Sequence, residues 1–216
     1  MSKKTWAINK TFTAIIWIIA IAIRLYGATT KAQIYDIGTF EAWSRTFWNH
    51  GPSNFFNVVW SDYLPLPILS FAPISLLADF LHAPFGLIFK LVHIALELFL
   101  ISLLPSSAFI AKLLLLLSPA LIGDNSFWGQ VDVIPALLSV VAVTSNSAVL
   151  FGLAVAYKPI MVLIAPLLWI NSIKKGDKWY RFPLISMVIF FATGIPTGGL
   201  HFATHLFTRI FDQAGT

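Results

Sequence analysis

The sequence ATTKAQIYDIGTFEAWSRTFWNHGPSNFFNVVWSDY, residues 28–63, is a long polar interruption in an otherwise apolar chain. Bilayer lipid rejects a segment with so many ionisable groups. Because membrane spans use their backbone polar groups internally, binding and catalytic groups tend to lie in long loops between spans. We therefore expect function in residues 28–63. Their ionisable side chains include Asp36, Glu41, Arg45, His50 and Asp62.

The composition of the whole chain predicts a membrane protein. Of its 216 residues, 58% are hydrophobic and 11% are charged, and the mean hydropathy is +0.82. A soluble domain carries roughly a quarter charged residues. We expect an all-α, polytopic membrane protein in which residues 1–216 form a single module. The absence of cysteine excludes disulfides, thiolate metal sites and a cysteine nucleophile.

The net charge of +5 does not indicate nucleic-acid binding, because the cations flank apolar segments instead of forming one patch. Short basic flanks lie on the cytoplasmic side of a membrane. The N-terminus is therefore predicted in the cytoplasm of an integral plasma-membrane protein, and residues 28–63 outside it. The flanking cations are Lys3, Lys4 and Lys10, and then Lys174, Lys175, Lys178 and Arg181.

Hydropathy predicts about seven transmembrane segments. Arg24, near the outer end of the first, is expected to reach the headgroups. Two of the segments, 106–122 and 131–144, are short for a crossing, which needs about 20 residues. Between these two lies a polar island, residues 123–132, which faces the cytoplasm if both cross, or lies at bilayer depth if they form a half-membrane hairpin. The segments are 11–27, 64–81, 86–104, 106–122, 131–144, 148–170 and 182–200.

Within the first loop, residues 36–49 are predicted to form a helix along the membrane interface, with Gly51-Pro52 ending it and a second short helix over 54–60. Asp36 is either an N-cap of that helix or a functional carboxylate. Glu41 and Arg45 have i,i+4 spacing, which favours an ion pair on the helix surface.

Three ionisable groups lie deeper in the apolar segments. Lys158, near the middle of 148–170, costs roughly 3 kcal/mol to insert, so it needs an anionic ligand or an acid such as Glu97 or Asp132. His93 and Glu97 lie four residues apart on one helix face. They are either a structural pair or a substrate contact.

Four motifs follow one another along the chain: the first-loop acid Asp36, then Asp-Tyr-Leu-Pro-Leu at 62–66, Trp-Gly-Gln-Val-Asp at 128–132, and AYKPIMVLIAPL at 156–167. Together they resemble the polytopic GT-C glycosyltransferases that use lipid-phosphate-linked sugars. The second is similar to the Asp-Tyr-Pro-Pro-Leu motif of the dolichyl-phosphate-sugar-dependent enzymes, with Leu64 in place of a proline. The third resembles the Gly-Gln-x-Asp motif of mannosyltransferases, and the fourth a Lys-Pro span of bacterial members.

The resemblance implies transfer of mannose or another hexose from a polyprenyl-phosphate carrier to a glycan, lipid or protein acceptor outside the cytoplasm, with inversion. Asp36 matches the general base. The developing phosphate charge needs cationic partners. The expected substrate-binding residues are Asp62, Tyr63, Glu41, Trp128, Gln130, Asp132, Lys158, His201, His205 and Arg209.

Two further expectations concern cofactors and the extent of the chain. A divalent cation between Asp36 and Asp62 is compatible with the resemblance, although no acid cluster requires one. The polar ending at residues 211–216 indicates that the chain is an N-terminal fragment of a longer enzyme. The alternative function is a secondary transporter or a lipid or glycan flippase, since spans broken by proline and charges at mid-membrane fit that class too.

Overall fold

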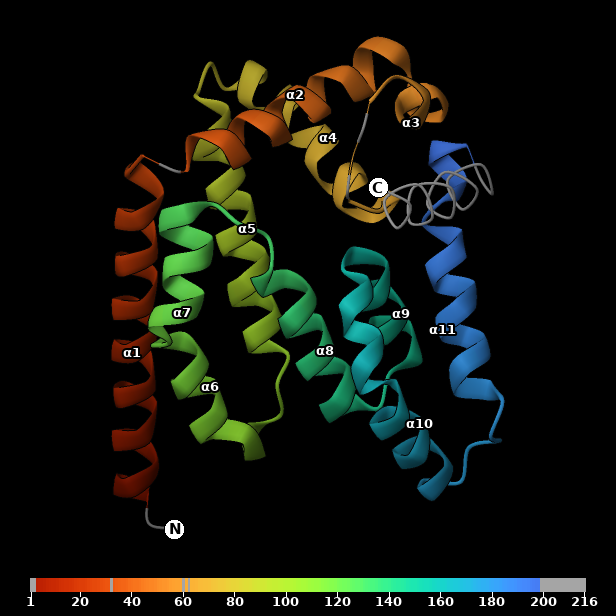
Figure 1. Ribbon diagram of the computed structural model, residues 1–216. Helices are drawn as coiled ribbons and strands as arrows, with labels where there is room; N and C mark the ends of the chain where they lie inside the picture. Colours follow the sequence, from red (N-terminus) through yellow and green to blue (C-terminus); the bar gives the residue numbers. More distant parts are fainter. Residues whose placement is uncertain (1–2, 32, 60, 62, 199–216) are drawn as a thin grey trace.

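The computed structural model describes residues 3–31, 33–59, 61 and 63–198 (Figure 1). Every regular element in this part of the chain is helical, and no strand occurs in it. Two of its helices contain stretches long and apolar enough to cross a membrane, Thr11–Thr29 in α1 (Lys3–Thr29) and Phe85–Ser102, which is α5. A third candidate is a broken segment bent by 55°. The all-helical prediction is thus confirmed for the described residues.

Helices α1 and α5 run antiparallel. Lys90, in the second turn of α5, donates from Nζ to the carbonyls of Gly27 and Thr30 at the end of α1, at 3.2 and 3.0 Å. The start of α5 therefore lies beside the end of α1. This end of the bundle carries α2, and we refer to it as the α2 end (Figure 1).

The first loop forms a helical layer over the α2 end. Helix α2 spans Ile34–His50, Gly51 ends it with φ +80°, and η1 (Pro52–Asn54) and α3 (Phe55–Val58) follow. The predicted helix and its break at Gly51-Pro52 are confirmed.

Helix α4 (Pro65–Phe80) does not behave as the expected second crossing. It runs back antiparallel along α2, with the Trp48 indole donating to the Ala72 carbonyl at 2.7 Å and Arg45 paired with Asp79. The turn at residues 81–84 consequently lies at the α2 end and not at the opposite one. The physical reason is that α2 has an apolar face, with Phe40 and Phe47 buried, and α4 covers it.

The next apolar segment is broken. Helix α6 (Phe109–Leu116) ends before Ser118, whose hydroxyl accepts from the Leu121 amide; α7 (Pro119–Leu121) and the π-helix η3 (Ile122–Trp128) follow at an angle. The chain then returns through α8, Val133–Ser145. The Gln33 amide donates to the Trp128 carbonyl at 3.0 Å. The polar island 123–132 therefore lies at the α2 end, beside the first loop.

Segment 148–170 is not one span, because the chain reverses at Lys158. Helix α9 (Ala148–Tyr157) approaches the α2 end, and η4 (Pro159–Ile164) and α10 (Ala165–Lys174) lead away from it. The side-chain amide of Asn171 donates to Asn146 Oδ1, so the residues just before α9 lie beside the C-terminal part of α10. Pro159 causes the break, because it lacks an amide hydrogen and restricts the residue before it.

The last described helix leads back to the first loop. Helix α11 (Arg181–Ala192) and η5 (Ile195–Thr197) end beside η1, where a Cβ built on Gly198 lies 3.2 Å from the Ser53 carbonyl oxygen. The opposite end of the bundle carries the start of α1, the α8–α9 turn and the α10–α11 loop (Figure 1).

Two glycines allow close helix packing, as is common between membrane helices. A Cβ on Gly27 would lie 2.8 Å from the Phe127 ring, so only glycine lets α1 approach η3 this closely. A Cβ on Gly152 would lie 2.7 Å from the Ser186 carbonyl of α11. Between the two layers, Phe40 of α2 stacks on Phe89 of α5 at 5.2 Å and anchors the α2 layer on the bundle.

Because the chain has no native cysteine, single-cysteine variants test this arrangement in sealed membrane vesicles. We expect Thr39→Cys, Leu81→Cys and Trp128→Cys to react with a membrane-impermeant maleimide from one side. Ser145→Cys and Lys175→Cys should react from the other. If Leu81→Cys labels from the Lys175 side, α4 crosses the membrane and the antiparallel α2–α4 pair is wrong.

Candidate functional site

Asp36 lies in the first turn of α2. The N-cap of that helix is Gln33, whose Oε1 accepts from the Tyr35 amide at 2.6 Å. Asp36 is therefore not the N-cap, and that alternative for it is wrong. A carboxylate in the first turn still interacts favourably with the partial positive charge of the helix N-terminus.

Two side chains from the polar island fix the Asp36 carboxylate. Trp128 Nε1 and Gln130 Nε2 both donate to Asp36 Oδ2, each at 2.8 Å. The structure thus brings together three residues of the predicted site, although Asp36 lies more than 90 positions before Trp128 and Gln130 in the chain. Both donors use the same carboxylate oxygen, Oδ2. Trp128 is 51% exposed, so the site is accessible.

A charged pair involves the next residues of the polar island. Lys158 Nζ lies 2.5 Å from Asp132 Oδ1, two residues beyond Gln130, and both side chains are partly exposed. Asp132 is one of the two acids expected to pair with Lys158. The lysine lies at the point where the chain reverses and not inside a continuous helix.

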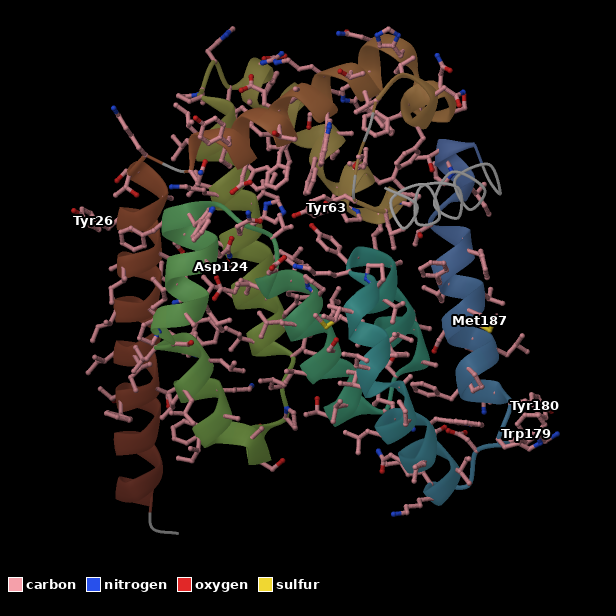
Figure 2. The ribbon with its side chains drawn as sticks, in the orientation of Figure 1. Tyr26, Tyr63, Asp124, Trp179, Tyr180 and Met187 are labelled. Atoms are coloured by element: carbon pink, nitrogen blue, oxygen red, sulfur yellow. The ribbon has the colours of Figure 1, made fainter. Side chains whose placement is uncertain are left out.

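Asp124 is a member of this region that the sequence analysis did not single out. It lies in η3, and its Oδ2 is buried without a hydrogen-bond partner among the described residues. π-Helical turns occur frequently at functional sites. The available signal was an acid in the polar island between two segments that are short for a crossing. Figure 2 shows Asp124 inside the bundle, between α1 and α8.

Beneath the site, a buried ionic network joins three elements. Arg24 Nη2 donates to Glu97 Oε1 at 2.6 Å, and Asn125 Nδ2 donates to Glu97 Oε2 at 2.8 Å. Arg24 also donates to the Leu116 carbonyl, and it is fully buried, as is Glu97. The expectation that Arg24 reaches the headgroups is therefore wrong, because a closer anion is available inside the bundle.

His93 does not pair with Glu97. Its Nδ1 contacts the Phe89 carbonyl at 2.8 Å, and its Nε2 lies 3.4 Å from the Tyr157 hydroxyl, which in turn contacts Ser70. His93 and Glu97 thus belong to two separate buried networks. His93 makes its contacts in the aromatic core and not in the candidate site.

The remaining expected residues lie elsewhere. Glu41 is in an exposed network with Arg45 and Asp79, as its i,i+4 spacing indicated, and the pKa of Arg45 is raised by hydrogen bonds to Asp79 and Glu41. Tyr63 packs among the rings of Phe40, Trp43 and Phe71 below α2 (Figure 2). The residues that lie outside the described part of the chain are Asp62, His201, His205 and Arg209.

In the part of the chain that the structure describes, no three histidine, aspartate or glutamate side chains are grouped to hold a metal ion. Asp62, one half of the expected cation pair, is outside that part. Comparisons of the chain with family models, curated proteins and solved structures give no match. Arguments about function therefore depend on the geometry of the residues themselves.

We expect Glu97→Leu to lower the free energy of unfolding by about 3–5 kcal/mol, because it leaves Arg24 charged and buried without a counterion. Arg24→Met combined with Glu97→Leu should recover most of that loss. Unfolding in mixed micelles measures both. The control is Glu41→Gln, which breaks an exposed pair and should change stability by less than about 1 kcal/mol. A double variant as unstable as the single one would contradict this account of the pair.

Proposed function

We propose that this protein is a membrane glycosyltransferase, which moves a hexose such as mannose from a polyprenyl-phosphate carrier to a hydroxyl of a glycan, lipid or protein acceptor. The reaction takes place at the α2 end, outside the cytoplasm. The observation that carries the proposal is the Asp36 carboxylate held by Trp128 and Gln130.

A membrane location with several crossings is part of the proposal. Large apolar side chains face outward along α1 and α11, for example Ile18 at 66% and Met187 at 57% exposure (Figure 2). Extended apolar surface of this kind favours contact with lipid over contact with water. The excess of Lys and Arg around the N-terminus and in the α10–α11 loop supports a cytoplasmic position for the end opposite α2.

Asp36 supplies what the chemistry requires at the acceptor. An alcohol that attacks an anomeric carbon must lose its proton to a base within hydrogen-bond reach. Asp36 Oδ1 takes this proton as the acceptor oxygen forms a bond to C1 of the sugar. The bond from C1 to the phosphate oxygen breaks, and the phosphate leaves with the electron pair. Attack from the face opposite the phosphate inverts the configuration.

Lys158 and Asp132 act at the donor in this proposal. The phosphate gains negative charge as it leaves, and a fixed cation stabilises that charge. Lys158 is partly exposed and lies at the same end as Asp36, with Asp132 orienting its ammonium. Both groups are held by backbone breaks, at Lys158-Pro159 and at the end of η3, and not by long flexible loops. His201, His205 and Arg209 remain candidates for the same role.

The decisive experiment is sugar transfer by the full-length protein in membranes that contain tritiated polyprenyl-phosphate mannose or glucose. We expect Asp36→Asn to reduce transfer at least 100-fold, because the amide cannot accept the proton. The matched control is Asp79→Asn, which removes an exposed carboxylate of α4 that pairs with Arg45. Equal transfer by wild type and Asp36→Asn would exclude Asp36 as the base.

The two donors to Asp36 give a finer test. Trp128→Phe keeps an aromatic ring at this position but loses the indole N–H. We expect about a 10-fold loss of kcat, which corresponds to one hydrogen bond to a charged group. Trp48→Phe is the matched control, since Trp48 also donates from Nε1, but to the Ala72 carbonyl away from the site. Equal losses in the two variants would argue against a positioning role for Trp128.

A secondary transporter or flippase is the second candidate, and one observation favours it. The chain reverses at Lys158, so a broken element carries the Lys158–Asp132 pair, and broken helices with charged groups are typical of transporter binding sites. If wild-type protein transfers no sugar from either donor but moves a labelled lipid-linked sugar between vesicle leaflets, this candidate replaces the transferase.

A further inference from the structure

The end of the bundle opposite α2 has a groove of its own. Its volume is about 280 Å³, and it lies between α8 and α10. The residues that line it are mostly apolar, and two of these residues are exposed, Leu167 at 61% and Ile170 at 52%. The polar groups lie toward the C-terminal end of α10. The lining residues are Val143, Leu167, Leu168, Ile170, Asn171 and Lys174.

The rim of this groove is strongly basic. Lys174 lines it, and Lys175, Lys178 and Arg181 follow within seven residues, all exposed. The single acid in this segment, Asp177, is already engaged by the Ser172 hydroxyl at 2.6 Å and by Arg181 at 3.6 Å. Among the described residues, no acid lies within ion-pair distance of Lys174, Lys175 or Lys178. These cations outweigh the partial negative charge of the α10 C-terminus.

Aromatic side chains border the same segment. Trp169, Trp179 and Tyr180 are exposed, and the Trp169 indole donates to the Trp179 carbonyl, which ties the loop to α10. Figure 2 shows Trp179 and Tyr180 projecting away from the bundle. Trp and Tyr in this setting lie at headgroup depth in a bilayer. The cations, the exposed aromatic side chains and the apolar groove therefore all lie at the same end of the bundle.

We propose that this groove binds one anionic phospholipid. An acyl chain lies along Val143, Leu167 and Ile170, and the headgroup phosphate is bound by Lys174, with the other three cations adding to the local positive potential. The groove is smaller than a typical whole-ligand pocket of 300–1,000 Å³, so it holds part of a chain and not an entire lipid. Topology alone explains cations in a cytoplasmic loop, but it does not require an apolar groove beneath them.

This inference depends on the membrane location proposed above and not on sugar transfer. It is also separate in space, since α2, which contains Asp36, and the C-terminal end of α10, which carries Lys174, lie at opposite ends of the bundle (Figure 1). A failure of the transferase assay would leave the lipid site untouched, because lipid binding is measured without turnover.

The test is native mass spectrometry of the full-length protein in detergent, titrated with phosphatidylglycerol or with phosphatidylcholine of the same chains. We expect one tightly bound phosphatidylglycerol and at least fivefold weaker phosphatidylcholine binding. Lys174→Ala should weaken phosphatidylglycerol binding about fivefold, which is the effect of one cation near an anionic headgroup. Lys174→Arg should keep the affinity within about twofold of wild type.

Two more variants separate the parts of the site. Lys112→Ala is the matched control: Lys112 is a half-buried lysine of α6 that donates to the Ser102 carbonyl, and its loss should leave binding unchanged. Leu167→Trp places a larger side chain in the wall of the groove and should weaken the binding of both lipids. Equal affinity for the two lipids, or equal losses in Lys112→Ala and Lys174→Ala, would overturn the proposal.

Discussion

The Arg24–Glu97 ion pair is the constraint on which the rest of this structure depends. Both side chains are fully buried, and Asn125 donates to the second oxygen of the Glu97 carboxylate. A buried charge without a partner is costly, so α1, α5 and η3 are stable only when they meet at this point. The pair therefore fixes where η3 lies against α1, and the Gln33–Trp128 backbone bond and the Asp36 contacts form directly above it.

The two ends of the bundle differ in their backbone structure and in the side chains that they present. At the α2 end, breaks in the helices present short polar segments from distant parts of the chain to one another. Asp36, Gln130 and Lys158 come from three such segments. At the opposite end the helices close with tight turns, and the α10–α11 loop carries cations and aromatic rings over an apolar groove. The proposed chemistry and the proposed lipid contact thus lie at opposite ends of one scaffold.

Features that depend on neighbouring residues could be predicted from the sequence. The helix after Gln33, its end at Gly51-Pro52 and the Glu41–Arg45 pair all follow from local rules. The partner of Lys158 was narrowed to two acids because an inserted lysine needs an anion. The grouping of Asp36 with Trp128 and Gln130 was implied only by the family resemblance, since hydropathy left open on which side residues 123–132 lie; the structure adds the hydrogen bonds that join them.

Other features depend on packing that hydropathy does not encode. Hydropathy does not distinguish an apolar segment that crosses a bilayer from one that packs along another helix, and α4 does the second because it covers the aromatic face of α2. The reversal at Lys158 was not expected either, since Pro159 predicts a break but not its angle. Arg24 was assigned to the headgroups because its partner lies 73 residues away, and Asp124 was overlooked because its burial depends on the whole bundle.

The π-helical winding of η3 has a consequence for how this chain tolerates length changes. A π-helix accommodates one more residue per turn than an α-helix, so Ile122–Trp128 contains in effect one inserted residue. Because the π winding absorbs that residue, the register on either side is kept, and inserting one more residue would rotate everything after the segment by about 100° relative to α1. Trp128 and Gln130 would then point away from Asp36, although no residue of the site itself had been changed. The spacing of this segment is therefore as much a part of the site as its side chains.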